Sequence, residues 1–500
     1  MMGKTQQRQA KLFYTAFSLD QRVGPDNKYR RILQAVDFSF VRPMVASLYG
    51  SKGNESSDPI VIMKLMLILF IENVSSEREL MRRLPERLDW LWFCQYDLDD
   101  PIPDHSVLSK ARRRWGLAVF ERFFQDILAQ CHQAGLIGGE TIHIDPSLIK
   151  GNASADSLKP AFAVLARETF ERLETQCDAL DTPQAKGYPT VCSLESPSVA
   201  SAPIEPATHL SSTDPEARCR KKGRQEVIGY QEHRIVDDRY GIITASDTTD
   251  ASVHESRMLE PLLRQHQANT DSCPTTLVGD KAYGTSENYK HLQEQQIAPC
   301  IPHIKHVTTN KAGYPREQFV YDPALDHYTC PAGQILKRVS NRPNVLGNIL
   351  YRAKASACRE CAHRQACLGG TKCPNGKSVC RSQNQGYLDW ADQYLSPSRR
   401  RYLLRRRGSV VEGSFADAAN HHGFKRSRWR GWLKVKIQNR MISTLQNLRK
   451  LLKYASTGRK AGLAAIKPSC FIAEAVVILI LLKLRRINPG YRSFFDDPPP

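Results

Sequence analysis

The segment Thr276–Pro302 constrains the fold more than any other part of this 500-residue chain. A short apolar run leads to Asp280, a glycine turn follows at Gly284, and Ser286 can cap a helix. The apolar run Ile297–Ile301 then reads as a buried strand, so the unit predicts strand, loop, helix and strand. An acid at the carboxyl end of a central strand faces the crevice where open α/β sheets bind ligands, although an Asp there also suits a turn.

Two further acids lie in comparable settings. Asp145 ends the alternating, strand-like segment Thr141–Asp145, and Glu412 lies on an expected helix with an apolar face. The order of expected elements is strand 141–145, hairpin 233–249, a helix, strand 276–280, a helix, strand 297–301 and the late helix with Glu412. Three antiparallel strands, a parallel fourth and these acids predict an α/β (α+β) fold with an RNase H-like core.

The charge of the chain favours a polyanionic partner. Lys and Arg number 71 against 51 Asp and Glu, which gives a formal net charge of +20 and a pI near 9.4. Nucleic acid is the first partner that such an excess suggests, and an anionic membrane is the second. The apolar runs Ile60–Ile71 and Cys470–Leu482 are too short to span a bilayer, and the polar start lacks a secretory signal, so we expect a cytosolic protein.

Residues 58–136 are predicted to form a compact helical domain of DNA-binding type after an N-terminal arm, 1–57. Ile60–Ile71 reads as a buried helix, and Ser76 with Glu79 makes a capping box for the next helix. A later helix ends in Arg112, Arg113 and Arg114, which we expect to face DNA. The alternative is a solvated basic helix end, since arginine there also complements the helix dipole.

The catalytic-type core is expected at 137–303 and 396–455, with a flexible insertion at 153–225 whose first part, 153–185, reads as helical. Residues 304–395 are predicted to form a cysteine-rich insertion, and 456–500 a tail. Cys330, Cys358, Cys361 and Cys367 are candidate ligands for a structural Zn²⁺, and Cys373 or His363 could replace one of them. The alternative is a set of unpaired, reduced thiols.

Two basic stretches flank Glu412. Residues expected to contact phosphates there are Arg405, Arg406, Arg407, Lys425, Arg426, Arg428 and Arg430. Such runs are more often solvated faces, but their position beside the third acid fits DNA contacts. Trp429 and Trp432 could stack on an unpaired base, although packing inside the protein is the favoured reading.

The ordered set of motifs resembles bacterial insertion-sequence transposases of the DDE class. The branch that it resembles has an N-terminal helical domain and a cysteine-bearing insertion before the third acid. The segments that carry the resemblance are Asp89–Phe93, Pro103–Ser109, Ile144–Asn152, Val278–Gly284, Val411–Asp417, Gly423–Gly431 and Gln446–Leu448. One departure is Ala419, where relatives often have a basic residue seven positions after the glutamate; Lys425 or Arg426 could take that role.

The resemblance implies that Asp145, Asp280 and Glu412 bind two Mg²⁺ or Mn²⁺ ions, which prefer carboxylate oxygen. It further implies cleavage at terminal inverted repeats, strand transfer into target DNA, and a homodimer on DNA. The cell location that follows is the cytoplasm, on the nucleoid. Two other interpretations remain open: a DNA-binding protein of this family whose catalysis has decayed, and a sequence-independent nuclease of the same fold.

Overall fold

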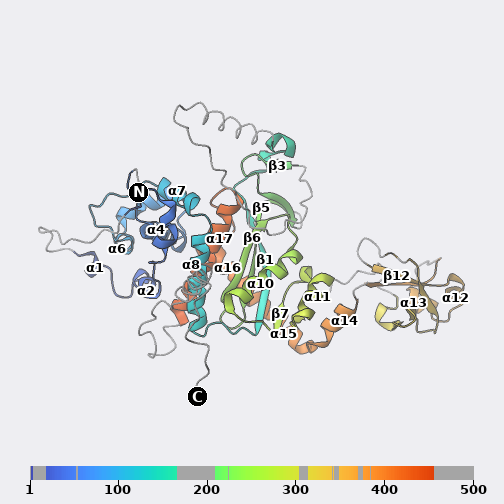
Figure 1. The fold of residues 1–500 in the computed structure, drawn as a ribbon. Coiled ribbons are helices and arrows are strands. Elements are labelled where there is room, and N and C mark those ends of the chain that lie inside the picture. The colour runs from blue at the N-terminus through green and yellow to red at the C-terminus, as the bar shows by residue number, and fades with distance from the viewer. Residues whose placement is uncertain are drawn as a thin grey trace, which may run out of the picture. The chain divides into compact units, whose positions relative to one another are not determined.

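The structure is a computed structural model (Figure 1) that describes residues 2–3, 18–51, 54–165, 209–222, 225–302, 313–340, 342, 348–369, 375–382 and 385–454. Its contacts divide the chain into Met1–Leu452 and Lys453–Pro500, and the elements below belong to the first unit. The tail 456–500, the apolar run at 470–482 and Cys373 lie outside the described residues.

The N-terminal region is helical, as predicted. Its helices are α1 (Leu19–Arg22), α2 (Lys28–Ala35), α3 (Val41–Val45), α4 (Pro59–Ile71), α5 (Glu77–Arg83), α6 (Leu88–Cys94), α7 (Ser106–Trp115) and α8 (Ala118–Gln133). The apolar α4 is buried almost all round, and Asp58 caps it by accepting from the Ile60 N–H at 2.9 Å. Ser76 caps α5 through the Glu79 N–H at 3.1 Å, so the predicted capping residue is confirmed.

A mixed sheet forms the centre of the unit (Figure 1). Its strands are β1 (Thr141–Lys150), β4 (Arg218–Lys222), β5 (Gln225–Asp237), β6 (Ile243–Asp250), β7 (Thr276–Val278) and β8 (Ala298–Cys300). The order is β6-β5-β1-β7-β8, with β4 also on β5; β1, β5 and β6 are antiparallel, and β7 and β8 run parallel to β1. The strands expected from the sequence are therefore present, and the parallel pair follows the antiparallel hairpin.

The two faces of the sheet are covered by different helices. Ile142, Ile144 and Ile235 point into the core cluster that α10 (Leu259–Thr270), α11 (Ser286–Glu294) and α14 (Gln385–Gln393) complete. Because side chains alternate along a strand, His143 and Asp145 face the opposite side. That side is covered by α15 (Pro397–Arg407), α16 (Gly413–His422) and α17 (Trp432–Tyr454).

A buried arginine holds the second layer to the sheet. Arg234 of β5 is fully buried and donates to Ser414 Oγ of α16 at 3.0 Å and to Gln446 Oε1 of α17 at 2.9 Å. Its guanidinium lies 4.6 Å from the Phe415 ring centroid and 4.8 Å from that of Phe424. This one side chain therefore fixes α16, the helix that follows Glu412, relative to the strand beside Asp145.

Three details differ from the sequence predictions. Thr285, not Ser286, caps α11, because its hydroxyl accepts from the Asn288 N–H at 3.3 Å. The helix expected from residue 153 is absent from 153–160, where a 3₁₀ turn and strand β2 (Leu158–Pro160) form instead. Strand β3 (His209–Ser211) pairs with β2, so backbone pairing competes successfully with the helix propensity of this stretch. Residues 166–208 of the predicted flexible insertion lie outside the described part.

The cysteine-bearing insertion has its own small sheet. It contains β9 (Val320–Asp322), β10 (His327–Thr329), β11 (Ile335–Arg338), β12 (Asn348–Ala353) and β13 (Ser378–Ser382), all antiparallel, with helices α12 (Ala355–Arg359) and α13 (Arg364–Leu368). A separate core of Phe319, Tyr328, Leu336 and Tyr351 supports it.

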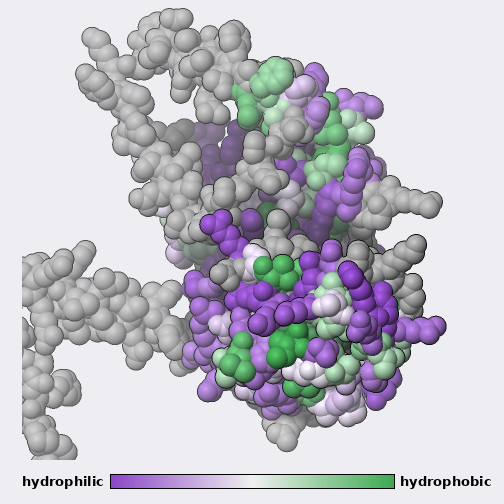
Figure 2. Space-filling model, turned by 90° about the vertical axis from the view of Figure 1, so that its right-hand side faces the viewer, coloured by the Kyte–Doolittle hydropathy of each residue, from purple (hydrophilic) through white to green (hydrophobic). Residues whose placement is uncertain are grey.

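Figure 2 shows a face covered mainly by hydrophilic side chains, with separate hydrophobic patches.

Among the residues described, no helix is long and apolar enough to cross a membrane.

Candidate active site

The two predicted aspartates lie at the same level of neighbouring parallel strands. His143 of β1 pairs in register with Val278 of β7. Asp145 and Asp280 each follow this pair by two residues, so the backbone brings both to the same end of the parallel pair. The close approach is visible at Gly279, where an added Cβ would lie 3.1 Å from Ile144 Cγ2. A residue larger than glycine would therefore require the Ile144 side chain to shift by a few tenths of an ångström.

Glu412 reaches these aspartates through a local change of helix type. Between α15 and α16 the backbone forms a π-helical segment, Gly408–Glu412, and the Gly413 N–H donates to the Gly408 carbonyl. In an α-helix, residues five apart are separated by about 140° around the axis. The i→i+5 pattern of a π-helix brings such residues onto one side, so Arg407 and Glu412 can meet.

Arg407 joins two of the three acids. Its Nη1 donates to Asp145 Oδ1 at 2.9 Å, and its Nη2 lies 3.0 Å from Glu412 Oε1. The Arg407 and Asp145 side chains are 18% and 15% exposed, so water screens this pair less than a surface ion pair. One guanidinium thus pairs with two carboxylates, one 262 residues away in the sequence and the other five residues away, and it offsets one of their two negative charges.

The electrostatics of Asp145 indicate that the three acids share one environment. Burial, with the negative charges of Glu412, Asp280 and Glu255, raises the pKa of Asp145 to about 7 against the opposing effect of Arg407. Burial also raises the pKa of Tyr283, with Asp145, Glu255 and Asp280 adding to the effect. Neither Glu255 nor Tyr283 was singled out from the sequence, which gives no signal for this proximity.

Within the described residues, no three Asp, Glu, His or Cys side chains are close enough to bind one metal ion directly. At the acids, the Arg407 guanidinium contacts both Asp145 and Glu412 and supplies the positive charge that their proximity requires. Asp280 Oδ1 meanwhile accepts from the Lys281 N–H at 2.6 Å. The donor set of three carboxylates suits a hard divalent cation, provided that Arg407 moves aside.

The basic residues expected at DNA fall into two groups. Arg112, Arg406 and Arg428 are engaged within the protein. Arg112 is 4% exposed and pairs with Glu77, and Arg406 Nε donates to Asp238 Oδ1 at 2.6 Å. Arg428 donates to Asn73 Oδ1 at 2.7 Å and to the Val74 carbonyl. By contrast, the side chains that lie exposed are Arg113, Arg114, Arg405, Lys425, Arg426 and Arg430.

Lys425 lies near the acids along β1. Its Nζ donates to Ser147 Oγ at 2.6 Å, and Ser147 is two residues beyond Asp145. The Lys425 carbonyl accepts from the Lys150 N–H at 3.0 Å, which holds this segment against the end of β1. Trp429 packs edge-on against Phe70, with ring centroids 5.8 Å apart, in agreement with the favoured packing role.

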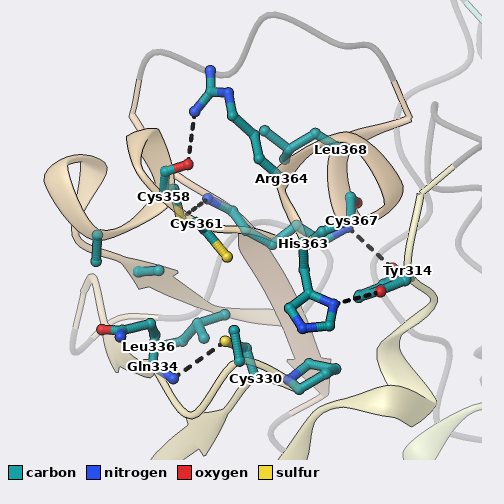
Figure 3. Close-up of a pocket in the computed structure, with 15 residues that line it drawn as sticks. Tyr314, Cys330, Gln334, Leu336, Cys358, Cys361, His363, Arg364, Cys367 and Leu368 are labelled. Carbon is teal, nitrogen blue, oxygen red and sulfur yellow. Dashed lines mark hydrogen bonds between the residues drawn. The ribbon is translucent and has the colours of Figure 1, made fainter.

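The four predicted cysteine ligands line one small cavity of about 30 Å³ (Figure 3). All four are free thiols: Cys330, Cys358, Cys361 and Cys367. Backbone N–H groups donate to two of the sulfurs, from Gln334 to Cys330 at 3.3 Å and from Lys377 to Cys358 at 3.5 Å. His363 also lines the cavity, but its Nδ1 lies 3.0 Å from the Tyr314 hydroxyl, toward which Figure 3 shows the ring turned.

Two segments of the chain match transposase families. Residues 17–114 match the family model described as Transposase domain (DUF772), and residues 329–452 match the one described as Transposase DDE domain. Both models describe transposase domains, and the second is of the DDE type, so the resemblance found in the sequence is confirmed. Glu412 lies within the second match, whereas Asp145 and Asp280 lie outside both.

Among individual proteins, the chain is similar to the transposase for insertion sequence element IS1106 of Neisseria meningitidis serogroup B. The two are 35% identical over 90 residues, which is 18% of this chain and only 29% of that relative's length. Among solved structures, the chain is similar to the piggyBac transposase in a synaptic complex with hairpin DNA. The two are 11% identical with a TM-score of 0.36, over 93% of this chain and 84% of the piggyBac chain.

Proposed function

We propose that this protein is an insertion-sequence transposase, which cuts DNA at terminal inverted repeats and joins the ends to target DNA. The observation that carries the proposal is geometric: Arg407 pairs with both Asp145 and Glu412, and Asp280 follows the strand paired in parallel beside Asp145. The sheet order β6-β5-β1-β7-β8, with β7 and β8 parallel to β1, supports an RNase H-like assignment for the core. The three acids, more than the fold alone, indicate the function, because one fold can serve many functions.

Asp145, Asp280 and Glu412 would hold the divalent ions. When bound, Mg²⁺ or Mn²⁺ would stabilise the negative charge on the attacking and leaving oxygens of the phosphodiester. The chain's own contribution would be to supply the three carboxylates from β1, from the loop after β7 and from the segment before α16. Water as the attacking group gives strand cleavage, and a DNA 3′-hydroxyl gives strand transfer, so one site serves both steps without a covalent protein intermediate.

Arg407 has two tasks in this proposal. In the free protein it forms ion pairs with both Asp145 and Glu412. When DNA binds, a phosphate offers the same guanidinium two oxygens in bidentate geometry, which is the preferred partner of arginine. Lys425 contacts Ser147, which lies on the same strand as Asp145, and is therefore positioned to bind a neighbouring phosphate. This position supports the view that Lys425 takes the role of the basic residue that relatives have where this chain has Ala419.

The cleavage test uses purified protein, Mg²⁺ and a plasmid that carries the coding segment with its flanking sequences. We expect cuts confined to the two ends of the element, and none when Mg²⁺ is chelated. Cuts at many unrelated positions would identify a sequence-independent nuclease instead. Specific binding of the ends without any cut would support a protein whose catalysis has decayed.

Replacement of Arg407 by glutamine is expected to change metal affinity and cleavage in opposite directions. Loss of the guanidinium removes a cation that competes for Asp145 and Glu412, so Mn²⁺ should bind the DNA-free variant roughly 10-fold more tightly. Cleavage should slow, because a phosphate contact is lost. Calorimetric titration with Mn²⁺ measures the first effect, and Arg405→Gln, an exposed neighbour, is the matched control. Equal Mn²⁺ affinity in all three proteins would contradict the competing role.

We also propose that Cys330, Cys358, Cys361 and Cys367 hold a structural Zn²⁺ in the insertion. The shared cavity and the N–H groups directed at two sulfurs support a thiolate site, since such donors stabilise the deprotonated form. Four protein ligands would leave no open position, so this ion would serve folding and not catalysis.

Elemental analysis of the purified protein tests the zinc site. We expect one zinc per chain in the wild type and a large loss of zinc in Cys361→Ser, together with a lower unfolding temperature, because binding free energy at such sites is folding free energy. The matched control is Cys380→Ser, which changes an exposed thiol of the same insertion and should keep its zinc. Equal zinc content in both variants would reject the predicted ligand set.

A further inference from the structure

A second, strongly basic cavity lies away from the acids. Its volume is about 550 Å³, and it is lined by side chains from the helical region and from the segment that leads into α17. The lining residues are Glu77, Ser109, Arg112, Arg113, Asn152, Arg428, Trp429, Arg430 and Lys434. Five of these are cationic and only Glu77 is acidic, so the cavity attracts anions.

The inner wall of this cavity is fixed by packing. The Arg112 guanidinium lies 3.8 Å from the Trp429 ring centroid and pairs with Glu77. Trp429 also packs edge-on against Phe70, and Arg428 is bonded to Asn73 and Val74. Two regions that are far apart in sequence are therefore locked into one rigid wall. With Arg112 over its ring, Trp429 is poorly placed to stack on a base.

The rim of the cavity, in contrast, carries cations that are free to bind a ligand. Arg113, Arg430 and Lys434 are exposed, and no carboxylate in the described part of the chain forms an ion pair with any of them. Nε of Arg112, which is almost fully buried, makes no hydrogen bond to any described atom. Exposed cations at a rim suit a ligand that continues beyond the cavity, as a nucleic-acid backbone does.

Strand β1 sets the distance from this cavity to the acids. Asn152 follows the end of β1 and lies seven residues after Asp145. At about 3.3 Å per residue this corresponds to roughly 20 Å. Duplex DNA advances about 3.4 Å per base pair along each strand, so the cavity is about six or seven base pairs from the cutting site.

We propose that this cavity clamps backbone phosphates of duplex DNA about six or seven base pairs from the scissile bond, through Arg113, Arg430 and Lys434. The inference rests on the proposed function only for the position of the cut, because DNA binding itself does not require catalysis. Because the clamp is built from α7 and the start of α17 together, the helical region and the catalytic region grip the same stretch of DNA.

The test compares the double variant Arg430→Gln/Lys434→Gln with the control Arg264→Gln/Lys290→Gln, which removes the same charge from exposed positions on α10 and α11. DNA affinity is measured by fluorescence anisotropy, without metal, at several salt concentrations, after thermal unfolding has shown that both variants fold. Each lost phosphate contact lowers the slope of log affinity against log salt by about 0.9. We expect a slope lower by about 2 in the cavity variant and an affinity loss of roughly 50-fold at 0.1 M salt.

Neutral methylphosphonate groups, placed one at a time along the DNA, locate the contact. In the wild type, binding should weaken most at the phosphates about six or seven positions from the cut, and this sensitivity should vanish in the cavity variant. Equal salt slopes for the cavity and control variants would overturn the clamp. So would a wild-type affinity that methylphosphonates weaken equally at every position of the DNA. Failure of the wild type to cut DNA would instead count against the proposed function, because the binding measurements remain valid without cleavage.

Discussion

Substitution of Asp280 by asparagine is expected to abolish DNA cleavage while leaving DNA binding intact. The change keeps the size and the capping oxygen that accepts from the Lys281 N–H, but removes the charge that a divalent ion needs. Charge stabilisation by metal is worth several kcal/mol, so cleavage should fall at least about 10³-fold. The measurement is the rate of plasmid cleavage in Mg²⁺ at saturating protein.

The matched control for this prediction is Glu294→Gln, which neutralises an exposed carboxylate at the end of α11 in the same structural unit. Its cleavage rate should equal that of the wild type. Cleavage by Asp280→Asn within about tenfold of the wild type would mean that this carboxylate does not bind the catalytic metal.

The second large effect is expected on stability, at Arg234. Arg234→Leu removes both hydrogen bonds that tie α16 and α17 to β5, and it leaves Glu232, 1% exposed, without its ion-pair partner at 3.6 Å. Breaking a buried pair in this way costs about 3–5 kcal/mol of the free energy of unfolding. For a cooperative unit of this size, Met1–Leu452, the unfolding temperature should fall by roughly 3–5 °C.

Thermal unfolding followed by circular dichroism measures this effect. Arg264→Leu, at an exposed arginine, should shift the unfolding temperature by no more than about 2 °C. The double variant Arg234→Leu/Glu232→Gln should recover part of the loss, because the unpaired buried charge is then gone. If Arg234→Leu were as stable as the wild type, this arginine would not be the link between the sheet and the helix that follows Glu412.

The strands and the two aspartates were predictable because their signals are local. Alternation marks β1, and apolar runs mark β7 and β8. The strand expected to end at Asp145 continues to Lys150, so Asp145 lies within β1, whereas Asp280 follows the end of β7. The buried helix α4 was equally readable from the apolar run Ile60–Ile71. Such features depend on neighbours within a few residues and on simple periodicity.

Contacts that depend on distant segments were not predictable. Helical periodicity separates Arg407 from Glu412, and only the π-helical segment brings them together over Asp145. In the same way, Arg112 was predicted to face DNA from a helix end, but its contacts with Glu77 and Trp429 hold it inside the protein. The basic cavity arises because two stretches more than 300 residues apart come into contact. The sequence shows that both stretches are basic, but it does not show that they lie together.

Localised backbone cleavage by bound iron tests the central claim most directly. Fe²⁺ can replace Mg²⁺ at carboxylate sites, and with peroxide and ascorbate it cuts the polypeptide next to the ion. The account predicts fragments that end near 145, 280 and 412 together in the DNA-bound protein, suppressed by excess Mg²⁺ and lost in Asp280→Asn. Cuts near only one of the three acids, or none near any, would show that these carboxylates do not share a metal site.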